Sequence, residues 1–251
     1  MTKRFLMTAA FVVATMFSIA SASAQGPWSF EHEMLFVRLH TAHGTSTDDV
    51  FGLDPAQRFA LSFTNSSNVG GRITFFDYDH DGSFTAPGGT RIVSLDMQNT
   101  DFELNKRLSL SCKTGLEACA GLRYSDNTVL FPSRFEPNDF RGLGGFLGLR
   151  GTTSVFTGGE LYARGKLAIL GGKGVHDGNG INTPVRYEQS RTHTEIAFGY
   201  QHAFQVRSLV VTPHFGTEWM NLSDYLIDPV DEQPESDMML GGLTFGVNLR
   251  F

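Results

Sequence analysis

Charged side chains occupy alternate positions in several stretches of this sequence. Arg164 and Lys166 are one residue apart, and so are Asp101 and Glu103, with a small or apolar residue between the members of each pair. Because successive side chains of a strand point to opposite faces, each pair lies on one face. This pattern predicts a polar interior lined by Arg58, Arg72, Asp101, Glu103, Arg107, Arg123, Arg150, Glu160, Arg164, Lys166, Glu195, His214, Glu218 and Arg250.

Such an interior is compatible with two functions. The charges can line a water-filled passage that favours anions, or they can pair with one another and fill the space. Barrels of about eight strands are just wide enough for side chains, whereas open channels are typical of roughly 16–18 strands. The sequence leaves both alternatives open.

Ser190, His193 and Glu195 come nearest to a nucleophile, a base and an orienting acid. Catalysis requires these groups within hydrogen-bond reach of one another, and no recognised lipase or protease motif surrounds them. We therefore predict no catalytic residues and no cofactor, with a lipid-acting barrel enzyme as the distant alternative.

Asp77, Asp79 and Asp81, followed by Gly82, match the first half of a calcium-binding loop. The motif needs a glutamate at its last position, where Gly88 stands here, and it needs flanking helices. We favour a solvated acidic turn over a cation site, and we predict no metal centre.

Cys112 and Cys119 flank the turn-like segment Lys113-Thr114-Gly115. In an oxidising compartment, a pair with this spacing favours a disulfide across the end of a hairpin. A free pair or a metal site is the alternative, although two sulfurs without a neighbouring histidine supply too few ligands for zinc.

The elements that carry these side chains are strands, and the last one is the clearest. Between Met238 and Phe251 an apolar row of every second residue, ending on Phe251, alternates with a small or polar row. A strand with one apolar and one polar face, placed at the end of an exported chain, is typical of a transmembrane barrel. Its terminal aromatic residue resembles the signal read by the barrel-assembly machinery, a role that we assign to Phe245, Val247, Leu249 and Phe251.

Nine earlier stretches show the same period, and short and long connections alternate between them. We expect an all-β fold, an antiparallel up-and-down transmembrane β-barrel of about ten strands, with eight or twelve as alternatives. Most spans fit the ~9–11 residues that a tilted strand needs to cross a bilayer. The expected strands lie in 30–40, 58–65, 71–78, 95–111, 118–125, 143–150, 161–169, 193–204, 209–219 and 238–251. A soluble barrel is the rival, and it would place Leu143, Leu147, Leu167, Phe215 and Phe245 inside.

The first residues have the three parts of a secretory signal. Lys3 and Arg4 precede an apolar run, and a small-residue site ends at Ala24. We predict a signal peptide at 1–24 and a barrel domain at 25–251. The net charge is −6, and it becomes −8 without Lys3 and Arg4, which disfavours nucleic acid as a partner.

Several pieces resemble the Legionella-type major outer-membrane protein family of pore-forming barrels. They are the segments at 140–151, 158–173 and 194–204 and the terminal strand, with 72–79 as a looser match. The resemblance rests on strand rhythm and on the placement of glycine and aromatic residues. It implies an outer-membrane barrel with pore activity, and it carries no active-site residues.

We therefore predict a porin-like passive pore for small solutes in the bacterial outer membrane. A structural or surface-interaction barrel with a plugged lumen is the alternative. The expected partners are outer-membrane lipid and lipopolysaccharide, and the barrel-assembly machinery during biogenesis.

Overall fold

A computed structural model of the chain describes residues 27–41, 52–86, 89–131, 136–177, 184–227 and 234–251. These residues form strands and turns, and no helix among them is long and apolar enough to cross a membrane. The predicted signal at 1–24 lies outside the described residues.

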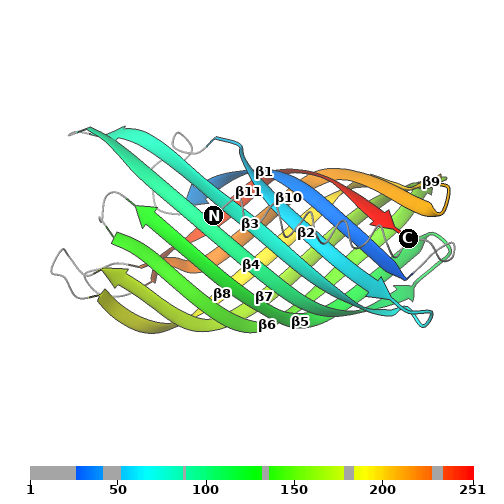
Figure 1. Ribbon diagram of the computed structural model, residues 1–251, viewed down its shortest axis with the longest axis horizontal. Coiled ribbons are helices and arrows are strands. Elements are labelled where there is room, and N and C mark those ends of the chain that lie inside the picture. The colour runs from blue at the N-terminus through cyan, green and yellow to red at the C-terminus, as the bar shows by residue number, and fades with distance from the viewer. Residues whose placement is uncertain (1–26, 42–51, 87–88, 132–135, 178–183, 228–233) are drawn as a thin grey trace.

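The described strands form one antiparallel sheet that closes on itself (Figure 1). Consecutive strands pair, except that β8 pairs with β10 rather than with the short β9, and β1 also pairs with β11 from Ser29 to Thr41, for example Met34 with Phe245. The strands are β1 (Trp28–Thr41), β2 (Asp54–Thr64), β3 (Val69–Ala86), β4 (Gly89–Ser109), β5 (Thr114–Phe131), β6 (Glu136–Phe156), β7 (Gly159–Asp177), β8 (Pro184–His202), β9 (Phe204–Val206), β10 (Leu209–Ile227) and β11 (Pro234–Arg250).

The wall of the barrel is ten strands around, as predicted. The structure has eleven strands because β8 and the short β9 share one position in the wall. β9 is a three-residue piece that pairs only with β10 and continues the position of β8 after Ala203. The sequence predicts a turn at 205–207, but Gln205 and Val206 extend this ladder, and the chain reverses at Arg207, whose φ is 56°.

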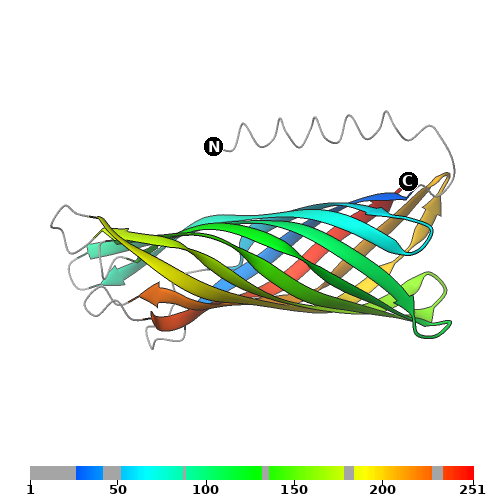
Figure 2. The same cartoon turned by 90° about the horizontal axis from the view of Figure 1, so that it is seen from below.

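The short turns at 65–68, 110–113, 157–158 and 207–208 lie at one end of the barrel, together with the start of β1 and the end of β11 (Figure 2). The strands are much longer than predicted, and β4 and β6 each have 21 residues. The stretches expected to be long connections, such as 79–89 and 171–191, are mostly hairpin arms. Their ladder hydrogen bonds continue where the apolar alternation ends. A prediction based on that alternation therefore makes the strands too short.

The outer face carries a belt of apolar side chains on the half nearer the short turns. Leu143, Leu147, Leu167, Phe215 and Phe245 point outward and are between 48% and 68% exposed. The rival soluble arrangement, which places these residues inside, is therefore wrong. Towards the long-loop end, the next outward residues are polar on strand after strand: Arg38, Gln57, Asp77, Gln98, Asp126, Arg141 and Lys173.

Candidate functional site

The polar half of the lumen holds three clusters of charged side chains, most of them buried. The central ion-pair cluster consists of Glu33, Arg58, Arg164 and Glu218, from β1, β2, β7 and β10. Arg58 binds Glu33 at 2.7 Å and Glu218 at 2.5 Å, and Arg164 binds the same two carboxylates. The cluster thus ties opposite sides of the wall across the lumen.

A second cluster joins β4, β5, β7 and β8. Arg123 makes a two-point contact with Asp101, with distances of 2.7 and 2.8 Å, and its Nη1 lies 2.6 Å from Glu195. Lys166 adds a contact of 2.7 Å to Asp101. Fork-to-carboxylate geometry of this kind fixes the orientation of both groups.

The third cluster lies nearer the short turns. Arg72 contacts Glu103 and Glu117, each at 3.2 Å, and Arg107 contacts Glu117 at 2.6 Å. The predicted lumen residues all lie inside the barrel. All except Glu218 line two internal cavities, and Glu218 is held by Arg58 and Arg164.

Beyond these charges, towards the other end of the barrel, the lumen is mostly apolar, and the buried polar side chains there include Ser125, Asn127, Arg191 and His193 on β5 and β8. The apolar layer consists of fully or nearly fully buried side chains from seven strands: Leu35, Val37, Leu39, Ala56, Phe76, Tyr78, Leu95, Met97, Val129, Met220, Leu222, Met238 and Leu240. A smaller cluster of Phe140, Phe146, Ala168 and Leu170 covers β6 and β7. Arg58 stacks over Phe76 and Lys166 over Phe146, so cation–π contacts connect the charged and apolar parts.

The side chains that fill the lumen leave two internal cavities of different size. The cavity within the charged clusters has a volume of about 70 Å³. A larger space of about 430 Å³, which we call the vestibule, lies at the short-turn end and is bounded by residues such as Ser29, Arg107 and Arg250.

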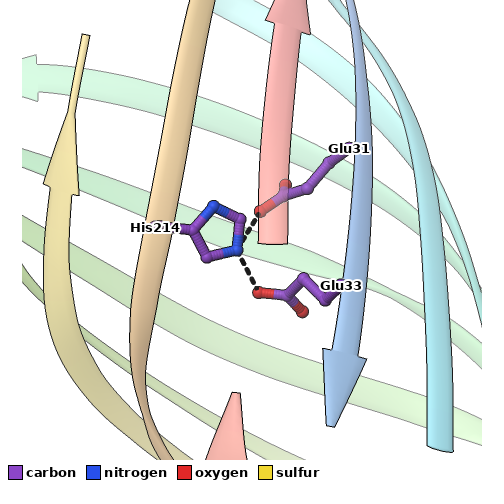
Figure 3. Close-up of side chains that lie close together, drawn as sticks. All are labelled: Glu31, Glu33 and His214. Carbon is purple, nitrogen blue, oxygen red and sulfur yellow. Dashed lines mark hydrogen bonds and ion pairs between the residues drawn. The ribbon is translucent and has the colours of Figure 1, made fainter. Parts of the chain in front are cut away.

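Glu31, Glu33 and His214 meet inside the barrel at the edge of these clusters (Figure 3). His214 Nε2 lies 3.0 Å from Glu33 Oε1 and 3.7 Å from Glu31 Oε1, and the imidazole crosses the inner face of β11 to reach them. Gly246 makes this crossing feasible, because a Cβ there would lie 2.4 Å from His214 Nε2.

These three side chains are close enough together to bind a divalent cation, with ligand atoms within 4.8 Å of one another. Both oxygens of Glu33, however, already accept hydrogen bonds from Arg58 or Arg164. A cation would have to compete with two guanidinium groups, so the arrangement is better suited to an ion-pair network than to a metal centre.

The sequence missed Glu31 and Glu33 because the first strand has apolar residues on both faces. Its inward row runs from Glu31 and Glu33 to Leu35, Val37 and Leu39, which belong to the apolar layer. The change from charged to apolar within one row was the signal available.

The other predicted sites are not assembled. Ser190 points outward while His193 and Glu195 point into the lumen, because residues separated by an odd number of positions face opposite sides of β8. Asp77, Asp79 and Asp81 lie on the outer face of β3, a continuous strand, so the predicted calcium-type turn is not formed. Burial beside Asp79, Asp77 and Asp126 raises the pKa of Asp96, on the facing strand, to about 6.

The predicted disulfide is wrong, since both cysteines are free. Cys112 is exposed in the turn, whereas Cys119 lies in β5 and faces the small inner cavity. The five steps from Thr114 to Cys119 rise about 16 Å along a strand, which carries Cys119 too far from the turn for the bond.

Comparison with known proteins supports the fold. No family model matches the sequence, and no curated protein sequence matches it. The structure is similar to the outer membrane protease OmpT from Escherichia coli, with a TM-score of 0.53, 10% identity, and coverage of 91% of this chain and 95% of that one. The translocator domain of the autotransporter NalP from Neisseria meningitidis matches with a TM-score of 0.46, 11% identity, and coverage of 99% and 96%.

The chain has the barrel fold of outer-membrane proteins. At 10% identity, the similarity to OmpT concerns the fold and carries no catalytic residue to this chain. Membership of the Legionella-type family is not confirmed.

Proposed function

We propose that the protein is an outer-membrane β-barrel with a side-chain-plugged lumen, serving as a structural or surface-interaction protein rather than as an open pore. The observation that carries this proposal is the succession of charged clusters and apolar layer along the lumen. Arg58 and Glu218, with at most 9% of either side chain exposed, leave no room for a hydrated solute between them.

The outer-membrane location is supported by the outward apolar belt. An arginine or lysine at the bilayer midplane costs about 2–4 kcal/mol, and the charged rows of this chain point inward at the level of the belt. We further propose that residues 1–24 direct export and are removed, leaving the barrel domain at 25–251.

We propose that the end with the short turns faces the periplasm. The hairpin arms at the other end then extend beyond the outer leaflet. Their outward side chains, such as Asp79, Arg141 and Lys173, are polar and exposed. These arms would present a wall of charged groups to lipopolysaccharide or to a partner at the cell surface.

The porin-like pore predicted from the sequence is the second candidate. The vestibule and the inner cavity share Arg72, Glu117 and Arg150 as lining residues, so they adjoin along the lumen. Conduction would also require the apolar layer to open, because residues such as Leu35 and Tyr78 have no exposed surface.

Cell fractionation and osmotic swelling of proteoliposomes test the two parts of the proposal. We expect recovery in the outer membrane with heat-modifiable gel mobility, and no swelling in small sugars. Recovery as a detergent-free soluble protein would contradict the location. Swelling at porin rates would contradict the plug and support the pore.

A further inference from the structure

The vestibule at the short-turn end is basic. Its walls include Arg72, Arg107, Arg150 and Arg250, against two carboxylates, Glu117 and Glu160. The volume of about 430 Å³ lies within the range of small-ligand pockets. The inner end is closed by the charged clusters, so the space is a pocket rather than a passage.

Two of these arginines, Arg150 and Arg250, form no salt bridge with a carboxylate of the described residues, although Arg150 lies across the ladder from Glu117, which Arg72 and Arg107 bind. Arg150 contacts the amide oxygen of Gln201 at 3.0 Å and the ring of Tyr162 at 5.7 Å. Arg250 is exposed at the mouth, opposite Ser29 and Val210 in the ladders.

The carboxylates of the vestibule are already engaged. Glu117 is shared by Arg72 and Arg107, and Glu160 accepts a hydrogen bond of 2.6 Å from Gln201 Nε2. Glu160 keeps its charge because Gln201 is neutral, but Arg150 and Arg250 outnumber it, so the net charge outside the salt bridges is positive. The two arginines stand on β6 and β11, which are not neighbours in the barrel, so a ligand reaching both must span the vestibule.

We propose that the vestibule binds a small molecule carrying at least two anionic oxygen groups, either phosphate or carboxylate. Guanidinium groups match the geometry of both kinds of oxyanion. Thr152, Thr212 and Asn248 line the same space and supply neutral donors for the remaining oxygens. If the proposed orientation is right, the ligand comes from the periplasm.

Titration calorimetry of the refolded barrel at low salt tests the site, with inorganic pyrophosphate and glutarate as probes. We expect saturable binding of at least one probe, and the tighter one identifies phosphate or carboxylate as the preferred group. Arg150→Gln and Arg250→Gln should each weaken binding about tenfold, the loss expected for one charge-assisted hydrogen bond.

Arg141→Gln is the matched control, because Arg141 lies on the outer wall, where its ion pair within the described part of the chain is with Asp126. It should leave the affinity unchanged, and heat-modifiable mobility should show that every variant is folded. Absence of binding by both probes would overturn the proposal. Equal affinity of the wild type and of the variant that combines Arg150→Gln with Arg250→Gln would also overturn it. Binding is measured on the folded protein in detergent micelles. A negative result would therefore not bear on the outer-membrane location or on the closed lumen.

Discussion

Arg58 on β2 and Glu218 on β10 meet inside the barrel through two hydrogen bonds of 2.9 and 2.5 Å, although β1 and β11 lie between their strands. Both side chains are almost completely buried. A tie of this kind, repeated by Arg164 and Arg123, holds the wall together from within and occupies the cross-section of the lumen.

Removal of one partner of this tie should destabilise the barrel strongly. Arg58→Ala leaves Glu33 and Glu218 with less compensation, and breaking a buried ion pair costs about 3–5 kcal/mol. Arg141→Ala removes an exposed pair with Asp126, which contributes about 0–1 kcal/mol. Urea unfolding followed by gel mobility would measure both, and equal losses would contradict the assignment.

Gly246 should not tolerate a side chain. Gly246→Ala places a Cβ against His214 and against the carbonyl oxygen of His32, which displaces the imidazole from Glu33 and costs about 1–3 kcal/mol. Gly151→Ala is the matched control, since a Cβ there meets nothing within 4 Å. Unfolding midpoints in urea should fall for the first variant and stay unchanged for the second.

A charged side chain in the outward apolar belt should block insertion of the barrel into a bilayer. Leu147→Arg puts a guanidinium on the outward face of the belt, at a cost of about 2–4 kcal/mol near the midplane. Gln98→Arg places the same group on the outer wall beyond the belt, in the polar row that includes Asp77 and Asp126. The fraction of protein that folds into liposomes should drop only for Leu147→Arg, and a similar drop for both would contradict the position of the belt.

Asp96 should make stability depend on pH in a defined direction. Its pKa in the folded state, about 6, lies above the ordinary value of 3.8, so the folded protein holds the proton more tightly than the unfolded chain does. Stability is therefore lost as pH rises from 3.8 to 6, and the loss is complete above pH 6.

Asp96→Asn should remove this loss. The variant should be more stable than wild type at pH 8, by less than about 1 kcal/mol because solvent screens a half-exposed group, and the difference should vanish near pH 4. Urea titrations at the two pH values check this, and a gain at pH 4 alone would contradict it.

The sequence was sufficient for the fold and for the direction of the charged rows. Alternation at period two placed Arg164 and Lys166 inside and Leu147 outside, and the turn positions followed from the short connections. The lengths of the strands and the apolar layer did not follow. Where both faces of a strand are apolar, as at Leu35 and Phe36, alternation does not show which face points into the lumen. Beyond the belt the strands remain paired, but no apolar row marks them in the sequence.

The contacts across the lumen were also outside the reach of the sequence. The pairing of Arg58 with Glu218 depends on the number of strands and on their stagger, which set the residues that face each other inside. The same stagger places Cys119 inside and Cys112 in the turn, against the expected disulfide. The assembly role of Phe245, Val247, Leu249 and Phe251 stays a prediction.

Single-channel recording in planar bilayers tests the central claim, a closed lumen, most directly. Folded wild-type protein should insert without conductance steps, because the charged clusters and the apolar layer fill the barrel. Steps of constant size from protein whose gel mobility shows it to be folded would contradict the plug and restore the pore.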